Sequence, residues 1–154
     1  MFKGVEFEVG NEYFVADINS VREVISWQEV SKVPNVPEFV EGIINLRGKV
    51  IPVVDLAKRF NFEVKVEPSK RKIMIVQVFG KLVGIIVDNV TRVVDVTDEM
   101  IDDTGILQNV ADTVAGYLKG VAKIDNKLVM IIDLEALFSP EERKHLEAAA
   151  DARN

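Results

Sequence analysis

The sequence predicts a mostly-β fold in which two small β-barrels, related to each other in sequence, pack together. Its apolar residues are dominated by β-branched side chains, with 26 Val and 14 Ile against 9 Leu among 154 residues. Such side chains suit a pleated, half-buried surface. Short apolar stretches separated by turn residues recur along the chain, as expected of strands. The second half of the chain also repeats the first.

Five strands are expected in the first half of the chain. Residues 5–9 alternate as VEFEV, the pattern of a half-buried strand, and Gly10 begins a turn that closes a hairpin. A tight turn at Arg47 and Gly48 joins the last two strands, and residues 56–60 form a helical turn. The expected strands are residues 5–9, 13–18, 22–29, 41–45 and 50–55.

A mostly polar stretch, residues 61–72, follows and contains Pro68 and Ser69. Such a change of composition is typical of a boundary between subdomains. Beyond it the strand pattern resumes, with a short helix start at residues 97–100 and a polar loop at residues 102–115. The expected strands of this second half are residues 73–79, 82–88, 92–96, 118–124 and 127–133.

A terminal α-helix is expected to start at Ser139. Ser139 can cap the helix, Pro140 fits its first position, and Glu142 completes a capping box. Residues 148–154 are expected to fray. The sequence thus predicts a first barrel, a linker, a second barrel and a C-terminal helix with a tail, with exchange of strands between the barrels left open. Their expected bounds are residues 1–62, 63–72, 73–138 and 139–154.

Two stretches of the first half recur in the second. Residues 39–60 align with residues 117–138 at a shift of 78, and five of the 22 positions are identical. Residues 13–25 align with residues 82–94 at a shift of 69. In the first alignment the turn residues Gly48 and Asn126 coincide, and both tolerate the positive φ of a tight hairpin. The neighbouring pair is Arg47 and Asp125, so the turn is kept while its charge is reversed.

Composition and motifs exclude several classes of function. A net charge of −6 and the isoelectric point near 4.9 argue against a nucleic-acid partner, which would favour a basic surface. The apolar runs are too short to cross a bilayer, and the start of the chain lacks a signal peptide. There is no cysteine, and the one histidine, His145, lies on the polar terminal helix beside Glu141. The acidic run at residues 95–103 lacks the spacing of a calcium loop. No catalytic, cofactor or metal site is therefore expected.

Arg47 and Trp27 are the sharpest candidates for contact with a partner. A guanidinium on a rigid hairpin tip can bind a carboxylate with two hydrogen bonds. Arg47 could equally pair within the protein, with Glu23 or Glu41. Trp27, the single tryptophan, either fills the core or anchors a contact surface, where tryptophan is enriched.

The segment FVEGIINLRGKVIPVVDL at residues 39–56 resembles the signature of CheW-like domains. Residues 17–25 and 84–90 match as well, and the likeness extends over roughly residues 5–146. This resemblance implies a pair of SH3-like five-stranded barrels without catalysis or cofactor. It implies a cytoplasmic scaffold, recruited to membrane receptor arrays through its partners. Those partners are the cytoplasmic tip of methyl-accepting chemotaxis receptors and the regulatory domain of the histidine kinase CheA.

The resemblance also implies which residues bind partners. Arg47 matches the motif arginine of receptor and array contacts, Glu23 and Val21 match the receptor-facing strand, and Gly42 matches the motif glycine. Asn45, Leu46 and Gly48 complete the expected partner-binding set. The contact to the kinase is expected to be apolar and to join barrel to barrel. A small-ligand-binding double barrel or an enzyme would need a pocket with converging polar groups, and an RNA-binding module would need a less acidic chain.

Overall fold

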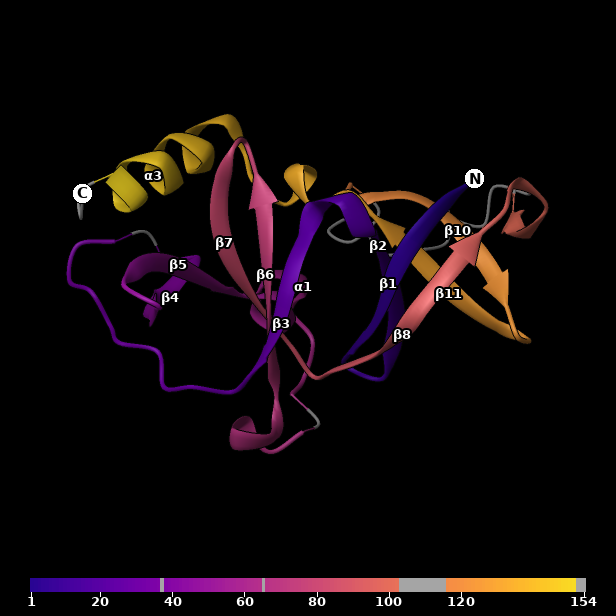
Figure 1. Cartoon of the computed structure of the whole chain (residues 1–154), viewed down its shortest axis with the longest axis horizontal. Helices are drawn as coiled ribbons and strands as arrows, with labels where there is room; N and C mark the ends of the chain where they lie inside the picture. Colours follow the sequence, from indigo (N-terminus) through magenta and orange to yellow (C-terminus); the bar gives the residue numbers. More distant parts are fainter. Residues whose placement is uncertain (37, 65, 103–115, 152–154) are drawn as a thin grey trace.

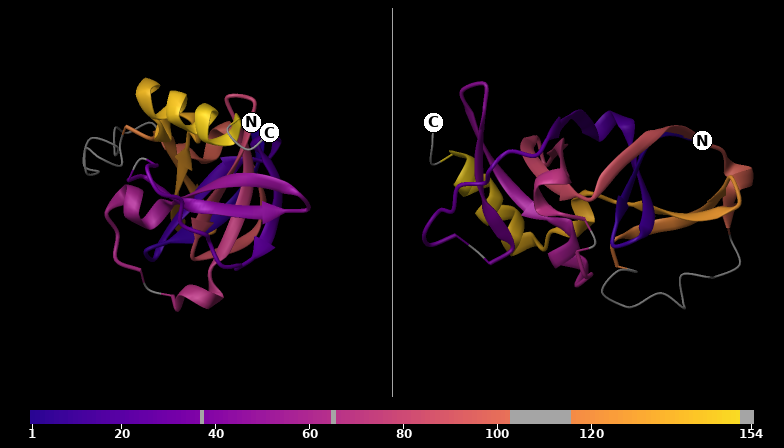
Figure 2. Two further views of the ribbon diagram at one scale, coloured as in Figure 1. Left: turned by 90° about the vertical axis from the view of Figure 1, so that its left-hand side faces the viewer. Right: turned by 90° about the horizontal axis from the view of Figure 1, so that it is seen from below.

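The computed structural model of the chain describes residues 1–36, 38–64, 66–102 and 116–151. In this described part, eleven strands form two sheets, a six-stranded sheet and a five-stranded sheet. The two sheets lie at opposite ends of the long axis (Figure 1, and the right-hand view of Figure 2). The mostly-β prediction is therefore confirmed. In neither sheet do the first and last of the described strands pair with each other, so the expected barrels are not closed by hydrogen bonds.

The six-stranded sheet has the order β8-β1-β2-β11-β10-β9. Its neighbours are antiparallel except for β2 and β11, which are parallel. The short β9 extends into the expected polar loop, whose residues 103–115 lie outside the described residues. The strands are β1 (Phe2–Val9), β2 (Glu12–Asp17), β8 (Asn89–Val96), β9 (Ile101–Asp102), β10 (Leu118–Ile124) and β11 (Lys127–Ile132).

The five-stranded sheet has the order β3-β6-β7-β5-β4, with β5 and β7 parallel. The expected third strand ends early, at Ser26, and the chain beyond it returns to pair Ser31 with Ile43 of β4. The strands are β3 (Val21–Ser26), β4 (Val40–Leu46), β5 (Lys49–Asp55), β6 (Lys72–Val78) and β7 (Lys81–Val87).

Short helices connect the strands. Asp55 caps α1 by accepting a hydrogen bond from the amide of Ala57, and Asn61 ends this helix in the left-handed region. The expected capping box of α3 is present, because the amide of Glu142 donates to Ser139 Oγ and the amide of Ser139 donates to Glu142 Oε1. The helices are η1 (Ile18–Ser20), α1 (Leu56–Phe60), η2 (Pro68–Lys70), η3 (Asp98–Met100), η5 (Glu135–Leu137) and α3 (Pro140–Asp151).

The sheets do not follow the expected division of the chain at residues 63–72. The five-stranded sheet uses residues 21–87, whereas the six-stranded sheet combines β1 and β2 with strands from residue 89 onward. Strand exchange, which the sequence left open, is thus how both sheets form. Whether the expected segments are also folding units stays a prediction.

The internal repeat explains the two strand orders. The alignments place β3, β7, β5 and β4 opposite β8, β2, β11 and β10. The two sheets therefore share one order, to which β9 is an addition. Even the parallel pairings agree in register, because Ile131 faces Val15 in one sheet and the equivalent Val53 faces Gly84 in the other.

Three apolar clusters hold the molecule together. The largest lies between the sheets and contains the stacked rings of Phe7, Phe14 and Phe60. A second cluster belongs to the six-stranded sheet and a third to the five-stranded sheet. Helix α3 lies over the five-stranded sheet (Figure 1) and buries Leu146 in the central cluster. Among the described residues, no helix is long and apolar enough to cross a membrane.

Candidate functional site

The β4–β5 tip presents the residues that the sequence singled out. Arg47 and Gly48 both have positive φ, 51° and 87°, as a two-residue hairpin turn requires. Asn45 Oδ1 accepts a hydrogen bond of 2.9 Å from the Gly48 amide, which fixes the turn. A Cβ at Gly48 would meet nothing within 4 Å, so the tip stands clear of the rest of the protein.

Arg47 pairs within the protein. Its Nη1 and Nη2 atoms donate to Oε1 and Oε2 of Glu23 on β3, at 3.1 and 2.5 Å. This bidentate geometry is the strong form of an arginine–carboxylate contact. It raises the pKa of Arg47 and lowers the pKa of Glu23, in each case mainly through the hydrogen bonds. Of the sequence alternatives, internal pairing with Glu23 is the one present, and the Arg47 side chain is still 69% exposed.

An equivalent ion pair with reversed charges lies in the other sheet. At the β10–β11 tip Asp125 Oδ2 is 2.7 Å from Arg92 Nη1 on β8. The repeat alignments place Asp125 opposite Arg47 and Arg92 opposite Glu23. The charge reversal at the tip is therefore matched by a reversal on the neighbouring strand. Because the repeat places Arg92 opposite Glu23 and Asp125 opposite Arg47, the sequence alone could have predicted this second pair.

Glu6 extends this second pair into a buried cluster that the sequence analysis missed. Its carboxylate is fully buried and accepts hydrogen bonds from Thr91 Oγ1 at 2.7 Å and Lys127 Nζ at 3.0 Å. Arg92 Nη2 lies 3.5 Å away. Burial is the largest single influence and raises the pKa of Glu6, but the hydrogen bonds from Thr91, Lys127 and Arg92 and the charge of Lys127 together outweigh it, and the pKa falls below its usual value.

Three other predicted partner-binding residues have structural roles. A Cβ at Gly42 would lie 2.2 Å from the Ser31 carbonyl oxygen, so this glycine permits the close approach of the 27–31 segment. Leu46 packs with Trp27 against the cluster of the five-stranded sheet. Val21 packs against the central cluster. Trp27 is partly buried and packs against the cluster of the five-stranded sheet, while its role in partner contact stays untested.

Comparison with known proteins identifies the family. The family model for the CheW-like domain matches residues 3–142. The chain belongs to the CheW-like domain family. It is 38% identical over 139 residues to a probable chemotaxis protein CheW of Rhizobium etli, covering 90% of this chain and 88% of the relative. It is 32% identical over 137 residues to the chemotaxis protein CheW of Thermotoga maritima, covering 89% and 87%.

A solved structure agrees with this assignment. The crystal structure of the scaffolding protein TtCheW from Thermoanaerobacter tengcongensis has a TM-score of 0.77 to this chain. The two are 38% identical, and the match covers 90% of this chain and 88% of the other. Both the fold and the identity therefore place the chain among CheW-like domains.

This CheW-like domain exposes one valine on each of two equivalent edge strands. Val24 on β3 is 40% exposed and Val93 on β8 is 54% exposed, and the repeat alignment places them opposite each other. Both strands are at the edge of their sheet. Unpaired edges with exposed apolar side chains are suited to contact with another chain. Alternation alone did not single out these two valines.

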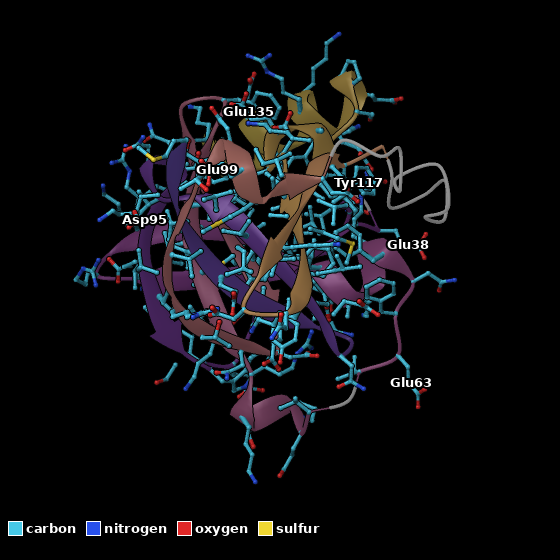
Figure 3. The ribbon with its side chains drawn as sticks, turned by 90° about the vertical axis from the view of Figure 1, so that its right-hand side faces the viewer. Glu38, Glu63, Asp95, Glu99, Tyr117 and Glu135 are labelled. Atoms are coloured by element: carbon cyan, nitrogen blue, oxygen red, sulfur yellow. The ribbon has the colours of Figure 1, made fainter. Side chains whose placement is uncertain are left out.

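In one cleft of this CheW-like domain, two of the charged side chains are already paired within the protein. An open cleft of about 370 Å³ is lined by side chains that include Asp55, Lys58 and Arg59. Lys58 already pairs with Glu41 at 2.6 Å and Arg59 with Glu142. Within the described ranges no group of three or more metal-ligating side chains occurs. Figure 3 shows Glu63, Asp95 and Glu99 at the surface, where acidic side chains are solvated.

Proposed function

We propose that this protein is a non-catalytic scaffold that couples methyl-accepting chemotaxis receptors to the histidine kinase CheA. The family match over residues 3–142 carries this proposal, together with the relatives that are named chemotaxis proteins. The similar crystal structure is that of a scaffolding protein, which supports the adaptor role. The protein would act in the cytoplasm and reach membrane receptor arrays through its partners.

The receptor contact is assigned to the β4–β5 tip and strand β3. A guanidinium has five N–H donors, and the pair with Glu23 uses two of them. The remaining donors of Arg47 can bind a carboxylate of a receptor helix without breaking the internal pair. Val24 on β3, which is 40% exposed, offers apolar contact to one face of such a helix.

The kinase contact is assigned to an apolar surface of a sheet. The CheA regulatory domain is expected to pack barrel to barrel against this protein. Val93 on the β8 edge is a suitable anchor because it is exposed, and β8 belongs to the six-stranded sheet, which lies at the other end of the molecule from the β4–β5 hairpin (Figure 1). Two separate surfaces allow both partners to bind at once, which coupling requires.

A charge swap tests the receptor contact. In Arg47→Glu two carboxylates face each other, so this variant loses the internal pair as well as any partner contact. The double variant Glu23→Arg with Arg47→Glu restores an ion pair of the reversed polarity that Arg92 and Asp125 already form. We expect it to fold as the wild type does and to fail to assemble a receptor fragment and the CheA regulatory domain into a three-way complex.

The outcome separates two roles of Arg47. Pull-down and size-exclusion chromatography measure the complex, and unfolding curves measure the fold. If the double variant assembles the complex as well as the wild type, Arg47 serves only the internal pair. A wild-type protein that binds neither fragment would contradict the coupling function itself.

A further inference from the structure

The chain crosses between the sheets twice, first through η1 between β2 and β3 and then at one buried residue, Asp88, between β7 and β8. Strand β7 ends at Val87 in the five-stranded sheet, and β8 begins at Asn89 in the six-stranded sheet. The Asp88 amide donates to the Glu8 carbonyl at 2.9 Å, and Oδ2 accepts from the Gly10 amide at 2.8 Å. Both contacts belong to the β1–β2 hairpin, so they fix Asp88 to the six-stranded sheet.

Arg71 is fixed in the same way to the five-stranded sheet. It directly precedes β6, and its Nη1 and Nη2 atoms donate to the Asp55 carboxylate at 3.1 and 2.8 Å. Asp55 is the last residue of β5, and its Oδ1 also accepts from the Ala57 amide at 3.0 Å. The guanidinium is therefore held by two hydrogen bonds to an anchored carboxylate.

The two anchored groups face each other across the junction of the sheets. Arg71 Nε and Asp88 Oδ1 are 3.7 Å apart, and in the described structure neither atom has a hydrogen-bond partner. Arg71 is 5% exposed and Asp88 2% exposed. At this distance the charges attract, but a direct hydrogen bond is not formed.

Such a network is a poor source of stability. Two carboxylates and one guanidinium leave one uncompensated negative charge in a buried place. Buried ion networks often contribute less than apolar residues of the same volume would, and their better-attested effect is to select one arrangement. The apolar cluster between the sheets attracts without direction, whereas the opposite charges of Arg71 and Asp88, each held in place by its own hydrogen bonds, attract along one line across the junction.

We propose that the Asp55–Arg71–Asp88 network is a conformational lock that sets the angle between the two sheets. The central apolar cluster holds the sheets together, and the lock decides how they are rotated relative to each other. In a scaffold with one partner surface on each sheet, this angle fixes the relative placement of the partners. The lock is a property of the free protein and does not depend on the proposed partners.

Distance measurements between the sheets test the lock. The chain has no cysteine, so spin labels can be attached to cysteines introduced at Lys49 on β5 and Lys119 on β10, which are both exposed. Asp88→Asn keeps an acceptor for the Gly10 amide but removes the attraction to Arg71. We expect its label–label distance distribution, measured by pulsed electron paramagnetic resonance on the full chain, to shift or broaden.

Two further variants make the result decisive. Asp95 on β8 forms an exposed ion pair with Lys3 on β1. The control variant Asp95→Asn removes this pair and should leave the distance distribution unchanged. The triple variant Asp55→Asn, Arg71→Met, Asp88→Asn removes all three charges while keeping volume, a change that proteins often tolerate. If it folds, it should also shift or broaden the distribution, even where Asp88→Asn alone unfolds. A folded triple variant with the wild-type distribution would overturn the lock.

Discussion

Gly42 offers the sharpest test of whether a motif residue is needed for the fold or for a partner. A Cβ at this position would lie 2.2 Å from the Ser31 carbonyl oxygen and 2.9 Å from its carbonyl carbon. These are backbone atoms, so the 27–31 segment must move away from β4 in Gly42→Ala. The two hydrogen bonds between Ser31 and Ile43, at 2.9 and 2.8 Å, would then break.

The expected loss follows from these contacts. Each net hydrogen bond contributes about 1 kcal/mol, and overpacking a tight site costs about 1–3 kcal/mol. The free energy of unfolding should therefore fall by about 3–5 kcal/mol, the sum of the two lost bonds and the displaced segment. For a chain of this size the thermal midpoint should drop by roughly 10 °C.

Gly80→Ala is the matched control for backbone strain. The φ of Gly42 is 156° and that of Gly80 is 75°, both in the positive range that side chains rarely adopt, but a Cβ at Gly80 would meet nothing within 4 Å. Its expected loss is about 1 kcal/mol, from the left-handed conformation alone. Urea unfolding of both variants gives the comparison. Equal stabilities would refute the close-approach argument. A Gly42→Ala variant that keeps its stability yet loses partner binding would instead make Gly42 a contact residue.

Three further predictions concern the pH dependence, the terminal helix and the strand exchange. Glu6 and Glu142 have lowered pKa values in the folded protein, so their contribution to stability should be fully present above about pH 4.5 and be lost as the pH drops through their folded pKa values. In urea unfolding, the free energy of unfolding should depend less steeply on pH in Glu6→Gln than in the wild type. An unchanged slope would contradict the role of Glu6. Arg59→Met removes hydrogen bonds to the Leu137 carbonyl and to Glu142, so amide hydrogen exchange should speed up in α3 but not in β6; equal protection in the variant would show that Leu146 alone holds the helix. Both sheets need strands from residues 1–66 and from residues 67–154. Each of these two fragments should therefore be unfolded alone, without a dispersed NMR spectrum, and the two should fold on mixing. A folded 1–66 fragment would instead support the sequential division.

Local pattern was sufficient for the strands but not for their partners. Alternation and turn residues predicted ten strands, and all ten are present with ends that differ by a few residues. Which strand pairs with which depends on contacts between residues far apart in the chain, and alternation is the same for either pairing. The repeat alignment predicts that the two sheets share one strand order, as they do, but it fits the sequential and the exchanged pairing equally well.

Two buried charged side chains, Glu6 and Arg71, could not be predicted from the local sequence pattern. Glu6 stands at an alternate position of the VEFEV strand, yet it is fully buried. The pairing of β1 with β8 shifts register between Glu6 and Phe7, and Thr91 and Lys127 close over the carboxylate. Arg71 belongs to a polar stretch expected to be a linker, but it is buried against Asp55. In both cases the partner that allows burial is distant in sequence.

The two hairpin tips carry opposite charges although each is neutral as a pair. Arg47 is 69% exposed and Asp125 68% exposed, and each is paired with a side chain of the neighbouring strand. The pairing suppresses any long-range field of either tip, so recognition has to occur at contact distance. There, the donors of Arg47 not engaged by Glu23 favour a carboxylate, whereas Asp125 favours a cation. Under the proposed scaffold function, a duplicated hairpin with inverted polarity would let the two ends of one small protein select different partners.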